Sequence, residues 1–156
     1  MYKKAFMEKL EEIIEESKTA LLSTIDDKGY PTSRWMSPIL LPGKDEYIYA
    51  ITASSFPKTH QINNSQKVEW LFQKKDLREI MNIKGKINVI DNPSIKKEIL
   101  EIMGDRLGVF WKINEDVSDM VVLETEILYF KYFKPMKGAY DILDLRGEYR
   151  MHLSLA

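Results

Sequence analysis

The fold is decided by residues 19–52, which read TALLSTIDDKGYPTSRWMSPILLPGKDEYIYAIT. Residues 19–25 are rich in β-forming side chains, and the aspartates and glycine of residues 26–29 favour a tight turn. The chain then returns through residues 31–41. A further run of β-formers follows over residues 47–52. The sequence therefore predicts three consecutive strands joined by short turns.

The rest of the chain predicts further strands and helices. Apolar residues at helical spacing indicate an amphipathic helix that ends near Ser17, and Asn92 precedes a second helix that ends near Gly104. Residues 81–89 alternate apolar and polar side chains, which predicts a strand with one buried and one solvated face. Pro38 should distort the strand over 31–41 because proline cannot donate to a sheet ladder. The other expected segments are strands over 68–73 and 120–133, a short helix from Ser55 and an irregular tail over 135–156.

These elements define the expected fold class. About six strands and three or four helices are expected, and hairpin connections dominate the first half. Such connections favour a mainly β (α+β) antiparallel sheet or barrel over a doubly wound fold. A chain of 156 residues suits a single domain over 1–156, with an N-terminal helix over 1–18 and a C-terminal tail over 135–156.

Composition narrows the class of protein. Hydrophobic residues make up 44% of the chain and charged residues 30%, which suits a soluble domain with a real core. The 23 basic and 24 acidic residues give a formal net charge of −1, which argues against a broad nucleic-acid-binding surface. The absence of cysteine excludes disulfides, thiolate metal sites and cysteine nucleophiles. No secretory signal or bilayer-spanning run is recognised, so a cytoplasmic protein with no membrane partner is expected.

One group of residues indicates an anion site. Arg34 on the second strand, Thr52 at the end of the third, Ser54 and Ser55 after it, and Lys58 at the start of the short helix fall within reach of one anion. Arginine grips a phosphate with two parallel hydrogen bonds, lysine adds a compact charge, and a helix start offers unpaired N–H groups. The sequence therefore suggests a phosphate-tethered cofactor.

The same residues also suit a purely structural role. Spacing alone favours this role, in which Arg34 pairs with a surface carboxylate and the serines cap a helix. A metal site is weakly supported, because only His60 and His152 are available and neither has a recognised ligand spacing. No catalytic nucleophile, P-loop or Rossmann glycine motif is found.

A family resemblance brings these residues together. Arg34-Trp35-Met36 after a Gly29-Tyr30-Pro31 turn, then Tyr49-Ala50-Ile51-Thr52, then Lys58-Thr59-His60-Gln61-Ile62-Asn63-Asn64 resembles the pyridoxamine 5′-phosphate oxidase-like family. The resemblance extends over residues 6–134 and is strongest to the short, general-stress-protein type.

The resemblance implies an FMN-binding split β-barrel that works as a homodimer, with the flavin at the subunit interface. It implies that Arg34 and Lys58 meet the FMN phosphate, assisted by Thr52, Ser54 and Ser55. The Trp35-Met36 backbone would line the edge of the ring, and Trp111 would come from the partner subunit.

Departures from the family pattern bear on activity. The oxidase-type pattern carries a second basic residue soon after the arginine, where this chain has Ser37-Pro38-Ile39, and Ser-Arg-Lys where it has Phe56-Pro57-Lys58. Pyridoxamine phosphate oxidation is therefore not expected. The sequence favours a flavin-dependent oxidoreductase of unknown substrate. The alternative is a flavin- or haem-binding carrier or stress-related sensor without turnover. No catalytic side chain is assigned.

Overall fold

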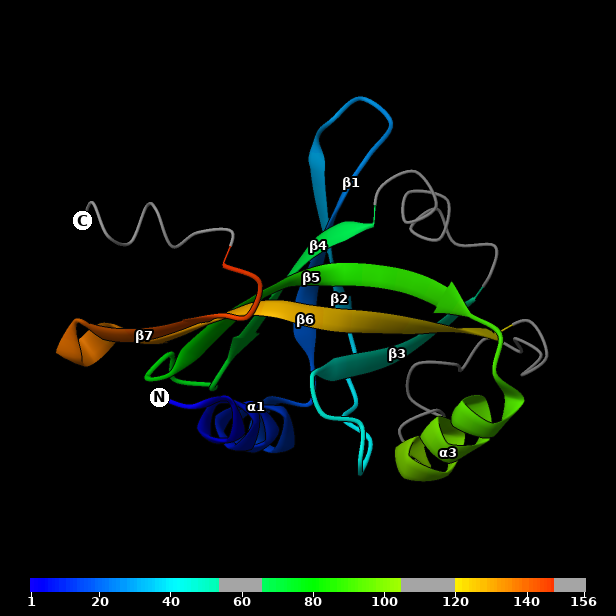
Figure 1. Ribbon diagram of the computed structural model, residues 1–156, viewed down its shortest axis with the longest axis horizontal. Helices are drawn as coiled ribbons and strands as arrows, with labels where there is room; N and C mark the ends of the chain where they lie inside the picture. The colour runs from blue at the N-terminus through cyan, green and yellow to red at the C-terminus, as the bar shows by residue number, and fades with distance from the viewer. Residues whose placement is uncertain (54–65, 105–119, 148–156) are drawn as a thin grey trace.

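The computed structural model describes residues 1–53, 66–104 and 120–147. In these segments seven strands form one antiparallel sheet, in the order β2-β1-β4-β5-β6-β3, with β7 paired to β6 (Figure 1). The elements are α1 (Lys3–Ser17), β1 (Ala20–Ile25), β2 (Pro31–Met36), β3 (Tyr47–Ala53), β4 (Lys67–Gln73), β5 (Ile80–Ile90), α3 (Pro93–Met103), β6 (Met120–Lys134), the 3₁₀ turn η2 (Pro135–Lys137) and β7 (Ala139–Asp144). The predicted mainly β, antiparallel fold of split-barrel type is confirmed.

The β1–β2 hairpin is set by its turn. Asp26 accepts hydrogen bonds from the backbone N–H groups of Lys28 and Tyr30 through Oδ1, at 2.9 and 2.8 Å. Gly29 takes a φ of +86°, which glycine adopts without a steric penalty. β2 ends at Met36, ahead of Pro38, so it is shorter than the predicted strand. The turn fixes a register in which Arg34 faces Leu22 across the ladder.

The sheet has two faces that differ in chemistry. The inner face is defined by the fully buried side chains of Leu22, Trp70 and Ile83, and the outer face by Ser23, Glu69 and Lys84. Side chains alternate between the faces along each strand because of the pleat. The alternation predicted for residues 81–89 is present in β5 as far as Ile87, but Val89, predicted to be buried, is 38% exposed.

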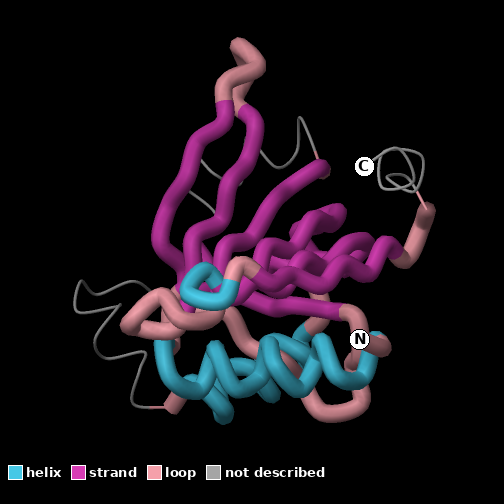
Figure 2. The backbone as a smooth tube through the Cα atoms, turned by 90° about the vertical axis from the view of Figure 1, so that its left-hand side faces the viewer, coloured by secondary structure: helices cyan, strands magenta, loops and turns pink. Residues whose placement is uncertain are grey.

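Both helices lie below the strands in the view of Figure 2, but they belong to different apolar clusters, α1 to the main core and α3 to a cluster on β3. α1 buries Phe6, Leu10 and Ile13 against the inner face, and the Phe6 ring lies 5.1 Å from that of Phe130 between centroids. α1 ends where Lys18 takes a left-handed φ of 63° and its N–H bonds to Ile14 O. The apolar stripe of α1 therefore covers the core, as the sequence predicts.

α3 packs on the other side of β3. Its N-terminus is capped by Asn92, whose side chain accepts a hydrogen bond from the Ile95 N–H, and Ile99 and Met103 are buried. They form a second apolar cluster with residues of β3 that include Tyr49 and Ile51. β3 is therefore buried on both faces. No helix in the described part of the chain is long and apolar enough to cross a membrane.

A β-bulge interrupts the pairing of β5 with β6. The register shifts between Lys84 and Gly85, which leaves Leu128 as an extra residue on β6. Gly85 lies so close to β6 that a Cβ built there would stand 2.3 Å from the Glu126 carbonyl oxygen. Glycine is therefore required at this position by close backbone approach rather than by a turn.

The prediction of an irregular tail after Pro135 is wrong for residues 139–144. These residues form β7, which pairs with Tyr129–Lys134 of β6. The first three residues of β7 are all exposed, so the segment lacks the alternation of buried and exposed residues that would predict a strand. Its pairing partner, the free edge of β6, is what makes it a strand.

Candidate functional site

Arg34 lies on the inner face of β2. Its Nη1 donates a hydrogen bond to Thr24 Oγ1 at 2.8 Å, and Thr24 is fully buried. Burial lowers the pKa of the Arg34 guanidinium, although arginine stays charged at any physiological pH. A partly desolvated cation of this kind gains from a nearby anion, and the planar guanidinium suits a phosphate or a carboxylate.

Two buried hydroxyls lie at the ends of β2 and β3. Thr52 on β3 is 1% exposed and Ser37, just after β2, is 8% exposed. Neither hydroxyl has a hydrogen-bond partner among the described residues. A buried hydroxyl without a partner costs about 1–3 kcal/mol, and a bound ligand commonly satisfies such a group. Both groups therefore fit a site that an anion completes.

A backbone bridge links the segment after β2 to β3. Ile39 exchanges two backbone hydrogen bonds with Tyr49 of β3, at 2.7 and 2.8 Å. The bridge therefore ties the segment that carries Ser37 to the strand that carries Thr52.

The neighbours of Arg34 on β2 differ in exposure. Met36 is buried in the main core at 5% exposed, whereas Trp35 is 59% exposed on the outer face, opposite Leu21 of β1. The Trp35 indole therefore points away from the Arg34 guanidinium, and only the backbone of Trp35 is shared with the inner-face group. Trp70 of β4 and Tyr49 of β3 are aromatic as well, and both are buried in the core.

Four of the predicted site residues lie outside the described residues, namely Ser54, Ser55, Lys58 and Trp111. Their roles stay predictions. Among the described residues, no group of three or more His, Asp or Glu side chains is placed to hold a metal ion. The structure thus describes the arginine and threonine half of the predicted anion site.

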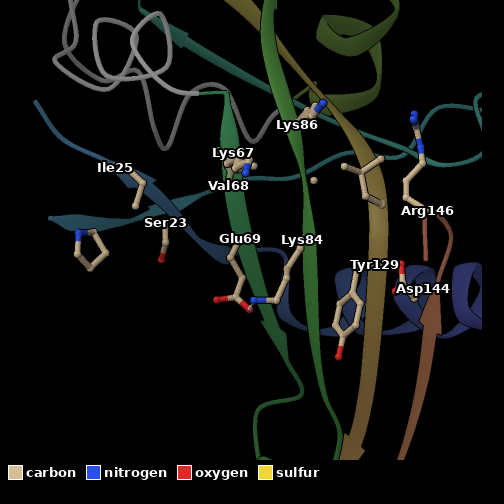
Figure 3. Close-up of a pocket in the computed structure, with 13 residues that line it drawn as sticks. Ser23, Ile25, Lys67, Val68, Glu69, Lys84, Lys86, Tyr129, Asp144 and Arg146 are labelled. Atoms are coloured by element: carbon tan, nitrogen blue, oxygen red, sulfur yellow. Dashed lines mark ion pairs between the residues drawn. The ribbon is translucent and has the colours of Figure 1, made fainter. Parts of the chain in front are cut away.

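A second hollow lies on the outer face and was not predicted. Figure 3 shows it spanning β1, β4, β5 and β6, with Asp144 and Arg146 at one side. The cavity holds about 340 Å³ and is lined by Lys67, Lys84 and Lys86 among other residues. In the sequence these lysines belong to the polar half of an alternating pattern, which is typical of an ordinary solvated face. The bulge, which the pattern does not reveal, adds Leu128 and Tyr129 to the lining of this hollow.

Comparison with known proteins decides the family. The sequence model described as pyridoxamine 5′-phosphate oxidase matches residues 6–134, which is most of the chain. The chain belongs to the pyridoxamine 5′-phosphate oxidase family. No curated protein sequence matches it significantly.

Solved structures of this family share the fold. A Clostridium acetobutylicum protein related to general stress protein 26 of Bacillus subtilis superposes with a TM-score of 0.72 at 16% identity, over 93% of this chain and 97% of that one. General stress protein 26 from Bacillus anthracis gives 0.68 at 20% identity, over 87% and 97%. A Nostoc punctiforme protein described as pyridoxamine 5′-phosphate oxidase-related and FMN binding gives 0.64 at 12% identity, over 92% and 98%. At these identities the likeness concerns the fold.

Proposed function

We propose that this member of the pyridoxamine 5′-phosphate oxidase family binds FMN and acts as a flavin-dependent oxidoreductase. The observation that carries the proposal is the inner-face group: a half-buried Arg34 guanidinium on β2 and, on β3, the buried Thr52 hydroxyl, which has no partner among the described residues. The Ile39–Tyr49 bridge links the segment after β2 to β3. A phosphate would supply the acceptor that the Thr52 hydroxyl lacks among the described residues. It would also offset the cost of desolvating the guanidinium.

In this proposal each residue binds or orients the cofactor. Arg34 donates parallel N–H groups to the phosphate, and Thr52 donates its hydroxyl proton. Lys58, Ser54 and Ser55 complete the phosphate contacts, as the family resemblance implies. The Trp35-Met36 backbone lies at the ring edge. Bound FMN supplies hydride or electron transfer, and the chain positions it and keeps water from it.

The proposal includes a homodimer with the flavin at the subunit interface. Its support is an apolar strip on the outer face, where Trp35, Leu21 and Leu71 follow one another across β2, β1 and β4. Trp35 is 59% exposed, and an exposed tryptophan in an apolar strip is typical of an interaction surface. The contribution of Trp111 from a second copy stays a prediction of the family resemblance.

A second candidate is a flavin-binding carrier or sensor without turnover. The observation that favours it is Ser37, which stands near the point where the oxidase pattern has a second basic residue and is buried and uncharged. One cation fewer at the phosphate weakens the hold on the cofactor. The two candidates share the binding site and differ only in the reactivity of the bound flavin.

The binding site is tested by a fluorescence titration with FMN. We expect Arg34→Ala combined with Lys58→Ala to weaken FMN binding by about a hundredfold or more, since charge-assisted hydrogen bonds contribute roughly 1.5–3 kcal/mol each. Arg78→Ala is the matched control, because Arg78 is exposed and pairs with Asp76 away from β2 and β3. Equal FMN affinity in the double variant and the wild type, with both folded by circular dichroism, would contradict the site.

Turnover is tested on the flavin-loaded protein. Reduction of the bound flavin by NADH or NADPH, followed by reoxidation by an added acceptor over many cycles, supports the oxidoreductase. Flavin that binds tightly and is not reduced by either donor supports the carrier or sensor. Gel filtration at several concentrations measures the proposed dimer in the same preparation.

A further inference from the structure

The cavity on the outer face is shaped by the β-bulge. The bulge places two consecutive residues of β6, Leu128 and Tyr129, along one cavity, where a regular strand would send them to opposite faces. Ile25 and Pro31, which face each other across the β1–β2 ladder, add apolar surface on the far side. A volume of about 340 Å³ lies at the lower end of the roughly 300–1,000 Å³ found for small-molecule pockets.

Two ion pairs account for part of the charge around this cavity. Lys84 Nζ lies 3.7 Å from Glu69 Oε1, the pair drawn with a dashed line in Figure 3. Arg146 pairs with Glu126. The remaining carboxylate, that of Asp144, is 9% exposed and accepts a hydrogen bond from the Gly147 N–H at 2.8 Å. Each acid beside the cavity therefore already has a partner.

Lys67 and Lys86 are the two lysines of the cavity lining that take no part in these ion pairs. They are Cα partners on β4 and β5, so their side chains stand directly opposite each other on the outer face. Neither makes an ion pair or a side-chain hydrogen bond with any described residue. The acids next to them, Glu69 along β4 and Glu126 across from Lys86 on β6, are bonded to Lys84 and Arg146. Like charges that face each other across a ladder are unfavourable, and an anion between them removes the repulsion.

We infer that this cavity binds a small aromatic anion, with its ring against Leu128 and Tyr129 and its carboxylate or phosphate between the ammonium groups of Lys67 and Lys86. The apolar lining accounts for the ring and the unneutralised lysine pair for the anionic group. The volume limits the occupant to a molecule of about one ring.

This site is separate from the proposed flavin phosphate site. Thr24, which accepts the hydrogen bond from Arg34, lies on the inner face of β1, while Ser23 and Ile25 on either side of it line the cavity. The sheet itself stands between the two groups of residues. The inference therefore does not depend on flavin binding and extends beyond the proposed function.

The test is a ¹H–¹⁵N NMR titration of the full chain with three probes, repeated after saturation with FMN. Benzoate and phenyl phosphate present a ring with a carboxylate or a phosphate, and benzamide presents the same ring without charge. We expect both anions to shift the amide signals of Lys67, Gly85, Lys86 and Leu128 saturably, with FMN present or absent. Tighter binding of one anion over the other identifies which anionic group the lysines prefer.

A charge-removing variant tests the lysine pair. Lys67→Gln with Lys86→Gln should weaken binding of the preferred anion by at least about tenfold, since each charge-assisted contact is roughly twice as strong as a neutral one. Lys96→Gln with Lys97→Gln removes two charges from α3 and should leave the affinity unchanged. The Lys67/Lys86 variant should fold normally, because neither lysine has a partner to lose among the described residues.

Three results would overturn the inference. One is equal affinity of the Lys67/Lys86 variant and the wild type for the preferred anion, and another is binding of benzamide as tight as that of benzoate. The third is displacement of the probes by FMN together with loss of FMN affinity in the variant, which would make the cavity part of the flavin site. If FMN does not bind at all, the titration without FMN still decides the question.

Discussion

Ser23 and Thr24 are adjacent on β1, yet their side chains belong to two different sites. Thr24 is fully buried on the inner face and accepts a hydrogen bond from Arg34, whereas Ser23 shares a hydrogen bond with Ser33 at 2.7 Å on the outer face. The strand pleat produces this division. One strand thus supports a candidate cofactor site on one face and a solvent-open cavity on the other.

Polar groups on the two faces differ in how much they lower the stability of the fold. On the inner face, an unpartnered group such as Thr52 has lost its water and lowers stability until something binds it. On the outer face, Lys67 and Lys86 remain exposed to solvent, and their repulsion is weakened by it. Changes on the inner face should therefore alter stability and binding together. Changes on the outer face should alter binding alone.

The largest expected effect on stability is at Gly85, in the bulge between β5 and β6. Gly85→Ala should destabilise the fold by about 3 kcal/mol or more, because the new Cβ would collide with the Glu126 carbonyl and the Thr125 methyl. The free energy of unfolding in urea measures this loss. Gly43→Ala is the control: Gly43 has a positive φ but open space around it, so only about 1 kcal/mol is expected. Equal losses in the two variants would mean that the bulge tolerates a side chain.

Two buried threonines of the inner face sharpen the comparison. Thr125 Oγ1 accepts a hydrogen bond from Trp70 Nε1 at 3.0 Å, while Thr52 has no partner among the described residues. Thr125→Val should cost about 1–3 kcal/mol because it strands the buried indole N–H. Thr52→Val should leave the apoprotein unchanged or stabilise it by up to about 1 kcal/mol, and should weaken FMN binding by about tenfold. Thermal unfolding with and without FMN measures both effects. A stability loss in Thr52→Val equal to that in Thr125→Val would refute the unpartnered state of Thr52.

The next largest effect on stability is expected at Glu79, whose carboxylate has several partners. Glu79 is bonded to Lys74, Tyr132 and Lys9; partial burial opposes its ionisation, but these contacts together lower its pKa from 4.5 to about 2. A lowered pKa in the folded state means that the carboxylate stabilises the fold above pH 4.5, and that this stabilisation is lost as the pH falls toward 2.

Glu79→Gln should therefore destabilise the fold at pH 7 by about 1 kcal/mol, after allowance for solvent screening, and by less at pH 3. Urea unfolding at the two pH values measures the difference, with Glu11→Gln on the exposed side of α1 as the control. A difference that does not shrink in acid would show that the Glu79 carboxylate is not the source of the stabilisation.

The smallest effect is expected from the lysine pair. Lys67→Gln removes the repulsion from Lys86 across the ladder and should raise the free energy of unfolding by about 0.2–1 kcal/mol at low salt. Lys67 is chosen because Lys86 also faces Glu126 on β6. High salt should reduce this gain, since exposed charges are screened. Lys97→Gln on α3 serves as the comparison. Destabilisation by Lys67→Gln at low salt would mean that Lys67 has a favourable partner.

The caps and periodicities of the sequence located most of the elements. The apolar stripe of α1, the Asn92 cap of α3 and the alternation in β5 each depend on residues close together in the chain, and each prediction is confirmed. The candidate site was predicted less completely. Residue type and spacing indicate Arg34 and Thr52, but their burial on the inner face and the missing partner of Thr52 among the described residues follow from strand pairing.

The features that were missed depend on pairing over long distances. β7 is a strand because the edge of β6 is available to it, and the cavity exists because the bulge inserts Leu128 into β6. The sequence of residues 139–144 does not indicate a strand, and the Lys84-Gly85-Lys86 sequence does not indicate a bulge. Both features depend on the register between strands.

By itself, the sequence determined most of the segments that form helices and strands, which of their faces are apolar, and which residue types were available for an anion. Local sterics, capping and hydrophobic periodicity act within a few residues, so they can be recognised from the sequence. Only the tertiary structure decided that the side chains of Arg34 and Lys86 lie on opposite faces of one sheet. It also decided that Thr52 has no partner among the described residues. Those outcomes come from register and closure, which are set by the packing of the whole sheet.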